Sequence, residues 1–371
     1  MKIIDKLNYD FICRYMLTES SEFWKGKYQL WHRKHGSYIR HLADSKACSF
    51  KELTVADEKE ISRIWGGYKR YYNHHFFEFY KSVDPEHVQY YFPDDFWYLY
   101  VDLALTKPWI AYAIDDKNMY DLYFHDVQRP KTVIRKIGGT YLNSEYDIIS
   151  EENALQICSQ HGDVIIKPAV DSEGGHGIHF WSGDQEIVEL KKLLTGANVV
   201  VQEVVKQHDS LDRLHKGSVN TVRIMAMQRE NTIEVLSSVV RMGIGSAKVD
   251  NASSGGIVCG INTDGSLKSC AYDVRGNRYD KHPQGTVFSE CKIPNLDKCI
   301  ELVQHLAPRF SYCSKLQSWD FAIGVDGTPI LIEVNLTYGE LDFHQMCNGP
   351  ILGTKTSDFL QYIVKNNKML K

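Results

Sequence analysis

The sequence lacks the features that mark several large classes of protein. No run of residues approaches the ~18 consecutive apolar positions that cross a bilayer. The first residues, Met1 to Arg14, carry charged side chains where a secretory signal would be apolar. Lys and Arg total 43 against 47 Asp and Glu, a net charge of −4, so no broad basic surface for nucleic acid is expected. These absences predict a cytoplasmic protein with no transmembrane segment and no nucleic-acid partner, and they leave open a peripheral position at the inner face of the membrane.

Several local motifs are also absent. The nine cysteines include no C-x-x-C pair, which predicts reduced thiols and not a disulfide framework. There is no G-x-x-x-x-G-K-S/T P-loop, no G-x-G-x-x-G Rossmann turn and no G-x-S-x-G hydrolase elbow. The histidines His32, His35, His74 and His75 have no partners at zinc-ligand spacing, so we interpret them as packing or surface residues. Any chemistry must therefore reside in other patterns.

What is present is the composition of a folded protein with more than one lobe, since 43% of the 371 residues are hydrophobic and 24% are charged. Glycine is scarce over residues 1–114, and polar and apolar residues mix from Thr54 to Ile64, which predicts a mainly helical N-terminal lobe. Aromatic residues gather between Tyr68 and Tyr100. We interpret these rings as core packing, with a stacking platform for sugars as the alternative. We interpret Asp94-Asp95 as a helix N-cap.

The rest of the chain alternates short β-branched runs with helical patterns. Predicted strands cover Thr132–Ile134, Asp163–Ile166, Asn198–Val201, Val222–Met225, Ile233–Leu236, Ile257–Ile261 and Pro329–Val334. Predicted helices cover Ser150–His161, Gln185–Leu194, Asp297–Pro308 and Ser357–Lys365. Because tight turns join many of the strands, we expect antiparallel sheets and an α+β fold.

Three oxygen-bearing side chains lie on a predicted hairpin near the C-terminus. Asp320 is on the first strand, and Glu333 and Asn335 are on the returning strand. The two acidic residues fall near the open end of the hairpin, and Glu333 and Asn335, two positions apart, leave the same face. Hard oxygen ligands of this kind are what Mg²⁺ prefers, whereas the alternative is a structural ion pair. The pattern favours a magnesium site.

Two apolar strands end in polar residues that could contact a nucleotide. Lys167 closes the first strand and is followed by a Gly/Ser loop, Ser172-Glu173-Gly174-Gly175-His176-Gly177. A lysine and several backbone N–H groups can surround phosphates, although a plain turn is the alternative. Gln202 and Glu203 end the second strand, where backbone groups could bind an adenine edge. The alternative there is a core strand that reaches the surface.

In their order along the chain, these features resemble the ATP-grasp superfamily over about Asp115 to Ile363. The resemblance implies a helical lobe over 1–114 followed by two α+β subdomains, 115–203 and 204–371, that grip ATP. It implies that Lys117 and Lys167 contact the phosphates, that the Ser172–Gly177 loop covers the γ-phosphate, and that Gln202 and Glu203 lie at the adenine. It further implies that one or two Mg²⁺ ions are held by Asp320, Glu333 and Asn335.

The middle of this region is similar to the ribosomal-protein glutamate ligases, through Asn220-Thr221-Val222-Arg223, Arg241 and Asn251 with Gly255-Gly256. The stretch that contains Gln202-Glu203, His208 and Gly217-Ser218-Val219-Asn220-Thr221-Val222-Arg223, together with the aromatic helical N-terminal lobe, resembles the sugar-transfer-associated ATP-grasp proteins of surface-polysaccharide gene clusters. Ser318 stands where the D-alanine ligases carry an arginine. The resemblance therefore implies Arg223 or Arg241 as the catalytic arginine, and Asn220, Asn251, Gly255 and Gly256 as substrate-binding residues.

The activity that this resemblance implies is an ATP-dependent carboxylate–amine ligase acting through an acyl phosphate. Its substrates would be ATP, a carboxylate such as a uronic acid of a capsule or other polysaccharide precursor, and an amine such as an amino acid. Two alternatives stay open: a phosphotransferase acting on a sugar or small molecule, and a non-catalytic nucleotide-binding scaffold in glycan assembly.

Overall fold

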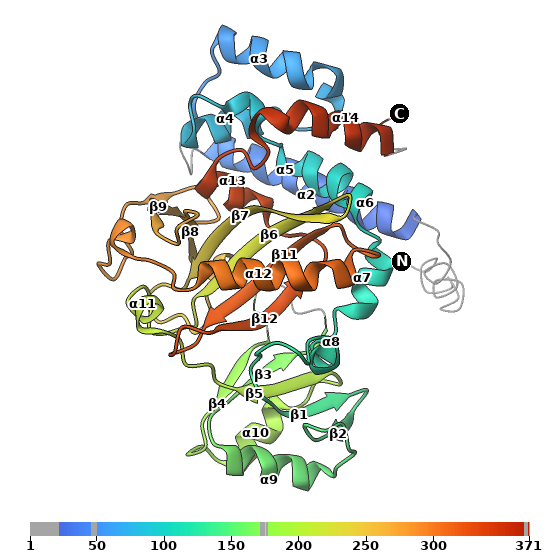
Figure 1. The fold of residues 1–371 in the computed structure, drawn as a ribbon, viewed down its shortest axis with the longest axis vertical. Helices are drawn as coiled ribbons and strands as arrows, with labels where there is room; N and C mark the ends of the chain where they lie inside the picture. Colours follow the sequence, from blue (N-terminus) through green and yellow to red (C-terminus); the bar gives the residue numbers. More distant parts are fainter. Residues whose placement is uncertain (1–21, 46–49, 171–174, 176, 367–369, 371) are drawn as a thin grey trace.

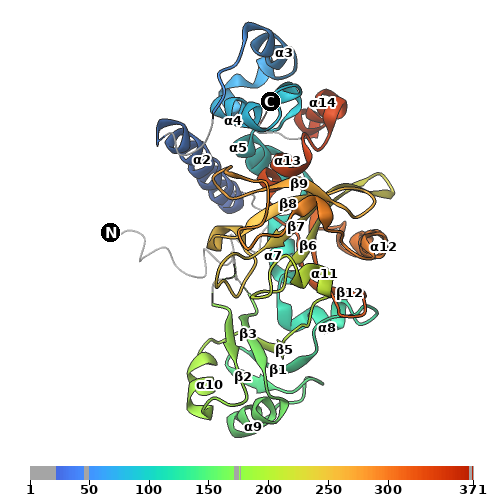
Figure 2. The same ribbon diagram turned by 90° about the vertical axis from the view of Figure 1, so that its left-hand side faces the viewer.

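Two antiparallel sheets and a helical lobe make up the chain in the computed structural model, which describes residues 22–45, 50–170, 175, 177–366 and 370. The helical lobe lies at one end, a seven-stranded sheet in the middle and a five-stranded sheet at the other end (Figure 1). The view in Figure 2 keeps this order, with α9 and α10 far from α3 and α14. The predicted α+β class is confirmed. Among the helices of the described residues, none combines the length and hydrophobicity needed to span a membrane.

The helical lobe is built around buried aromatic rings. Its N-terminal elements are α2 (Glu22–Ser45), α3 (Val55–Trp65), α4 (His75–Val83), α5 (Asp94–Phe96), the π-helix η4 (Trp97–Val101) and α6 (Asp102–Leu105). Trp65 is fully buried and meets Phe77, Phe92 and Phe96 edge to face, an arrangement that aromatic quadrupoles favour. The interpretation of these rings as core packing is therefore correct for most of them.

The N-cap interpretation of Asp94-Asp95 is wrong. Both residues lie in the first turn of α5, after Pro93, and both are buried. Asp95 Oδ2 accepts the backbone N–H of Asn73 at 2.8 Å, and Asp94 Oδ1 accepts the hydroxyl of Tyr80 at 2.5 Å. Asp95 also accepts the backbone N–H of Phe96 within α5 through Oδ1 at 2.8 Å, but the N-cap residue is Pro93. The tertiary donors Asn73 and Tyr80 are what sequence alone does not show.

The five-stranded sheet has the order β2-β1-β5-β3-β4. Its strands are β1 (Thr132–Ile137), β2 (Thr140–Leu142), β3 (Val164–Pro168), β4 (His179–Trp181) and β5 (Val199–Glu203). Helices α9 (Glu151–His161) and α10 (Ile187–Leu193) pack on one face, where Ala154, Cys158 and Leu190 bury alternate strand residues. The opposite face of β3 carries Lys167, so the sheet presents this lysine away from its own core.

The seven-stranded sheet has the order β10-β9-β8-β7-β6-β11-β12. Its strands are β6 (Thr221–Arg229), β7 (Thr232–Met242), β8 (Ile257–Ile261), β9 (Leu267–Tyr272), β10 (Arg278–Tyr279), β11 (Leu316–Ile323) and β12 (Pro329–Asn335). Helix α12 (Leu296–Leu306) covers one face. Helices α13 (Leu341–Asn348) and α14 (Thr356–Asn366) lie toward the helical lobe (Figure 1).

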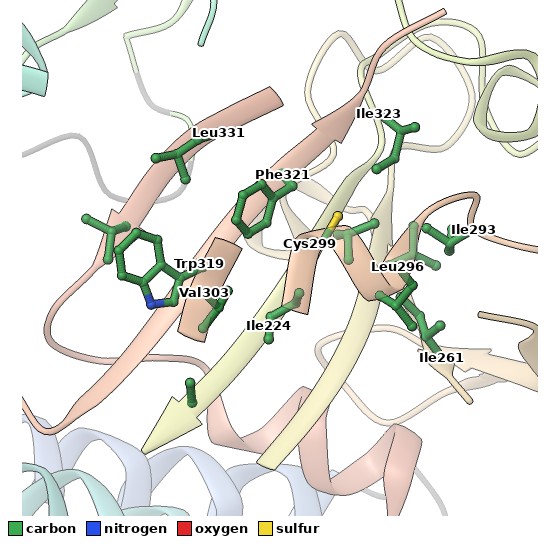
Figure 3. Packing of buried hydrophobic residues seen from close by; sticks show 14 of the residues in the cluster. Ile224, Ile261, Ile293, Leu296, Cys299, Val303, Trp319, Phe321, Ile323 and Leu331 are labelled. Carbon is green, nitrogen blue, oxygen red and sulfur yellow. The ribbon is translucent and has the colours of Figure 1, made fainter. Parts of the chain in front are cut away.

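Alternation along the strands separates the core of this sheet from its polar face. Trp319 and Phe321 of β11 lie beside α12, together with Ile224 of β6 (Figure 3). Because successive strand residues point to opposite faces, Asp320 and Arg223 point to the other face. The packing of α12 thus fixes which side of the sheet carries the charged residues.

The predicted lobe boundaries remain a prediction, but hydrophobic clusters cross them. Helices α7 (Pro108–Ile114) and α8 (Tyr120–Tyr123) contribute Ala111, Ile114 and Tyr120 to the core of the seven-stranded sheet. Helix α14, at the other end of the chain, contributes Phe359 and Leu360 to the aromatic core of the helical lobe. The lobes therefore share elements from both halves of the sequence.

Candidate active site

A cavity of about 1230 Å³ is lined by both sheets and by the helical lobe. Ligand pockets of this kind, concave and lined by a few converging polar groups, are the default candidates for an active site. The cavity brings together ten residues that the sequence singled out: Lys117, Lys167, Gly175, Glu203, Arg223, Arg241, Asn251, Asp320, Glu333 and Asn335.

The two acidic residues of the predicted hairpin face each other. Asp320 of β11 is paired with Glu333 of β12 in the strand register, and Asn335 is paired with Ser318. Burial raises the pKa of Glu333, but the charges of Lys117, Arg223 and other nearby cations outweigh it and hold this pKa at about 2. Glu333 is therefore ionised at neutral pH.

Two buried arginines converge on Asp320 from neighbouring strands. Arg223 of β6 donates through Nε to Oδ1 at 2.7 Å and through Nη2 to Oδ2 at 2.6 Å, a bidentate pair, and it also contacts Glu340. Arg241 of β7 donates to the same Oδ2 at 3.3 Å and lies 3.7 Å from Asp250. Arg241 Nε is buried and has no acceptor among the described residues. This unsatisfied donor makes Arg241 the better placed of the two to bind an anion.

The two lysines approach the carboxylates from the other side. Lys117 begins the short helix η5 (Lys117–Met119), and its Nζ lies 3.4 Å from Glu333 Oε2. Its backbone N–H donates to Ala169 at 2.9 Å, which ties η5 to the end of β3. Lys167 Nζ donates to Gln202 Oε1 at 3.4 Å. The cavity thus holds ammonium and guanidinium groups around a pair of carboxylates, an arrangement suited to a polyphosphate with a metal ion.

A buried arginine that the sequence reading missed supports Lys117. Arg135 of β1 donates to the carbonyl of Asn118 at 3.1 Å and also contacts Asp121. The hydroxyl of Tyr146 donates to the same Asn118 carbonyl at 2.7 Å, and its ring lies under the guanidinium. No local motif marks Arg135, because its partners come from two other segments, residues 118–121 and 143–146.

Of the two residues at the end of β5 that were predicted to lie at the adenine, one lines the cavity and the other does not. Glu203 lines the cavity, and its Oε1 accepts the backbone N–H of Lys131 at 3.1 Å. The side chain of Gln202 is buried in the sheet beside Lys167 and is not part of the lining. The wall continues through Val204 to Gln207, which the sequence reading did not single out.

Three predicted substrate residues lie behind the cavity wall. Asn220 is fully buried, and its Nδ2 donates to Gln207 Oε1 and to the carbonyls of Leu211 and His215. Gly255 and Gly256 close the turn after η7 (Ala252–Ser254); a Cβ on Gly256 would come within 2.6 Å of the Asp250 carbonyl. Asn251 alone of this group lines the cavity. Ser172, Glu173, Gly174 and His176 lie outside the described residues.

The donor set at the hairpin fits Mg²⁺ in chemical type. Asp320, Glu333 and Asn335 offer carboxylate and amide oxygens from paired positions of two strands. The buried Asn335 Nδ2 has no hydrogen-bond acceptor in the described part of the chain, so its amide is not committed to the sheet. The same part contains no cluster of three His, Cys, Asp or Glu side chains at metal distance, in agreement with a set of only two carboxylates.

The titration of Lys167 gives a testable expectation for nucleotide binding. Burial lowers the pKa of Lys167 to about 8, and the nearby charge of Lys117 adds to this effect, whereas Glu333 opposes it. Bound phosphates would favour the charged form. We therefore expect binding of a non-hydrolysable ATP analogue with Mg²⁺ to take up a proton above pH 8 and to weaken by up to about tenfold per pH unit there.

Calorimetry in buffers of different ionisation enthalpy measures this proton uptake. Lys167→Met should bind the analogue more weakly and without this pH dependence. Exposed Lys131, next to the same sheet, provides the control, and Lys131→Met should keep the wild-type profile. Equal affinity on both sides of pH 8 in the wild type would show that Lys167 does not meet the phosphates.

A known protein family matches most of this chain. Residues 105–360 match the family described as sugar-transfer-associated ATP-grasp. None of the curated proteins matches the chain. One similar solved structure is D-alanyl-alanine synthetase A from Vibrio cholerae O1, with 14% sequence identity and a TM-score of 0.40. The match covers 71% of this chain and 64% of the synthetase, so this chain spans less than two thirds of the synthetase's length. D-alanine–D-alanine ligase from Bacillus anthracis is 14% identical, with a TM-score of 0.39 and coverage of 72% of this chain and 74% of that one.

Proposed function

The chain belongs to the sugar-transfer-associated ATP-grasp family and is thus an ATP-grasp enzyme, and from this premise we propose that it is an ATP-dependent carboxylate–amine ligase. The observation that carries the proposal is the convergence of Lys117, Glu333, Asp320 and Arg241 on one cavity. This set provides positive charge for phosphates, oxygen ligands for a metal ion and a guanidinium donor for a substrate anion.

The chemistry explains why these residue types are needed together. A carboxylate reacts poorly with an amine because an oxide is a bad leaving group. Transfer of the γ-phosphoryl group of ATP to the carboxylate gives an acyl phosphate, and the amine then forms the C–N bond as phosphate departs. Catalysis of the first step consists mainly of positioning and charge neutralisation.

Each cavity residue has a role in this proposal. Lys117 and Lys167 bind the phosphates of ATP, and Glu203 with the following residues lies along the base. Arg241 binds the acceptor carboxylate and then the acyl phosphate, while Arg223 holds Asp320 in place. Asp320, Glu333 and Asn335 would hold Mg²⁺, which when bound neutralises phosphate charge.

We further propose that the carboxylate is a uronic acid of a surface-polysaccharide precursor and that the amine is an amino acid or an amino sugar. The family description supports an association with sugar transfer. The two alternatives, a phosphotransferase and a nucleotide-binding scaffold, predict different products from ATP: a stable phosphorylated sugar for the first and no ADP for the second.

Product analysis tests the proposal. The purified protein is incubated with ATP, Mg²⁺, glucuronic or galacturonic acid and a mixture of proteinogenic amino acids, glucosamine and ethanolamine. We expect mass spectrometry to detect ADP and an amide lighter by one water than the sum of its two substrates. ADP with a phosphorylated sugar and no amide would establish the phosphotransferase, and tight ATP binding without ADP would establish the scaffold.

A further inference from the structure

The helical lobe forms one end of the cavity, although nothing in the phosphate or metal chemistry requires it there. His35 of α2, Tyr98 of η4 and Tyr112 of α7 line this end. They are joined by Tyr338 and Glu340 from the segment between β12 and α13, and by Asp342 from the first turn of α13. We call these six residues the lobe end. Tyr98 belongs to the buried aromatic core of the helical lobe and also lines the cavity, and Tyr112 and Tyr338 are partly buried against the same core.

The backbone of the lobe end is unusual in two ways. Tyr98 lies in a π-helix, a rare conformation that is frequent at functional sites. Tyr338 and Glu340 are non-glycine residues in the left-handed region, with φ of 52° and 58°. Such conformations are costly and persist where the surroundings impose them, often at ligand sites. Both features place side chains in the cavity.

Four contacts fix this geometry. The rings of His35 and Tyr98 stack with centroids 4.6 Å apart, and the Tyr98 ring lies 6.1 Å from that of Tyr338. The backbone N–H of Leu341 donates to the Tyr98 hydroxyl at 3.0 Å. The backbone N–H of Tyr338 donates to Asp102 Oδ2 at 3.1 Å. The helical lobe therefore holds the start of α13, and with it Asp342, at a defined position.

The charge of the lobe end is negative. Glu340 is paired with Arg223, but Asp342 has no ion-pair partner within 4 Å among the described residues. His35 does not supply a cation at neutral pH, because burial and the neighbouring His32 lower its pKa to about 4. No lysine belongs to the lobe end. Among the described residues, the lysines that line the cavity come from segments outside it: Lys117, Lys167, Lys206, Lys216 and Lys248.

A carboxylate next to aromatic faces is the arrangement that binds an organic cation. We propose that the lobe end binds the amine substrate as an ammonium ion, with Asp342 as its counter-ion and Tyr98 as one of the rings beside it. This inference rests on the proposed function. An uncharged sugar would gain stacking from the rings, but it would leave the carboxylate of Asp342 without a counter-ion, which favours the ammonium.

The same carboxylate suits the proton transfer that amide formation needs. A primary ammonium loses two protons on the way to an amide. The first must leave before the nitrogen lone pair can attack the acyl carbon. The second leaves the nitrogen as the C–O bond breaks, and the phosphate that departs with the C–O electron pair can accept it. Burial, together with the charge of Glu340, raises the pKa of Asp342 to about 7, in spite of Arg223. Asp94, Tyr80 and Tyr98 also face this group, and none of them is a cation. A base of this pKa can accept the first proton near neutral pH.

Kinetics of Asp342→Asn with the amine and carboxylate that the wild type uses test this inference. We expect the KM for the amine to rise about 10- to 100-fold, as loss of a charge-assisted pair predicts, with a much smaller change in the KM for ATP. Asp342→Glu should recover most of the amine affinity. Asp297 provides a matched control, because it too follows a leucine at the start of a helix after a left-handed residue, and it is exposed on α12. Asp297→Asn should behave as the wild type.

Hydroxylamine separates this inference from the proposed function, because it is uncharged at neutral pH and traps the acyl phosphate without an ammonium site. A hydroxamate from the wild type together with an unchanged amine KM in Asp342→Asn would overturn the inference alone. A raised KM for the uronic acid in place of the amine would assign the lobe end to the other substrate and would also overturn it. Absence of any hydroxamate from the wild type would remove the proposed function, and this inference with it.

Discussion

Glu333→Gln should reduce ADP formation by at least about 10²–10³-fold at saturating Mg²⁺ and ATP, while the fold is retained. The substitution keeps the size of the side chain and removes one negative charge. Glu333 lies 3.4 Å from Lys117 and is opposite Asp320 in the strand register. Without the charge of Glu333, the metal site loses a carboxylate ligand. The positive charges of the nearby Arg223 and Arg241 are then balanced by one negative charge fewer.

A matched control separates this effect from a general loss of an ion pair. Glu234 also lies on a strand of the seven-stranded sheet and pairs with Arg229 at 3.2 Å, but it is remote from the cavity. Glu234→Gln should keep wild-type turnover. A coupled enzyme assay of ADP release measures turnover, and circular dichroism shows whether the fold is retained. Near wild-type turnover of Glu333→Gln at millimolar Mg²⁺ would mean that the assignment of the metal ligands is wrong.

The hairpin that carries these carboxylates could be predicted from local rules, but its register at Asp320 could not. A tight turn places residues at equal distance from it opposite each other, as Ile323 and Pro329 are, and would put Asp320 opposite Ile332. A bulge between Asp320 and Phe321 shifts the register by one residue, so that Asp320 pairs with Glu333 instead. The same rules predicted that Arg223 and Arg241 would lie on neighbouring strands, and the structure has them on β6 and β7. Strand alternation and tight turns are properties of short segments, so the sequence alone contains them.

Which polar residue at a strand end faces the cavity could not be predicted in this way. Gln202 and Glu203 are adjacent, yet only Glu203 lines the cavity. The side chain of Gln202 is buried between Lys167 Nζ and the carbonyl of Pro130. Asn220 matched a family motif, but its amide supports the backbone around Leu211 and His215. The motif identified the segment correctly and did not distinguish a residue that contacts ligand from one that shapes the loop.

The lobe end could not be predicted from the sequence because its contacts join residues that are far apart along the chain. Tyr98 and Leu341 are 243 positions apart, and their hydrogen bond depends on how the helical lobe packs on the seven-stranded sheet. That packing comes from apolar contacts, such as Met225 and Leu316 of the sheet against Trp97 and Leu99, which have no directional signature in the sequence. The aromatic content of the lobe could be seen in the sequence, but which of its rings also line the cavity could not.

Arg241→Lys should lower amide formation by about 10²–10³-fold, or about 2–4 kcal/mol of transition-state stabilisation, and should leave binding of an ATP analogue nearly unchanged. A guanidinium can bind a carboxylate or phosphate through two parallel N–H groups, which an ammonium does not reproduce. The buried Nε of Arg241 has no acceptor among the described residues, so this donor is available to the substrate. Hydroxamate yield after addition of hydroxylamine measures the loss directly, because it reports the acyl phosphate before the amine takes part.

Arg223→Lys should also lose activity, but because the structure around Asp320 is weakened. The melting temperature distinguishes this cause from the loss of a substrate contact. Arg223 binds both oxygens of Asp320, and a lysine would leave one of its buried hydrogen bonds unmade, at a cost of about 1.5–3 kcal/mol in stability. The melting temperature should therefore fall in Arg223→Lys and change little in Arg241→Lys. Arg278, exposed on β10 and paired with Asp280, is the control, and Arg278→Lys should keep both activity and stability. If all of these variants instead yield a stable phosphorylated product that hydroxylamine leaves intact, the acceptor is an alcohol, and Arg241 serves a phosphotransferase and not a ligase.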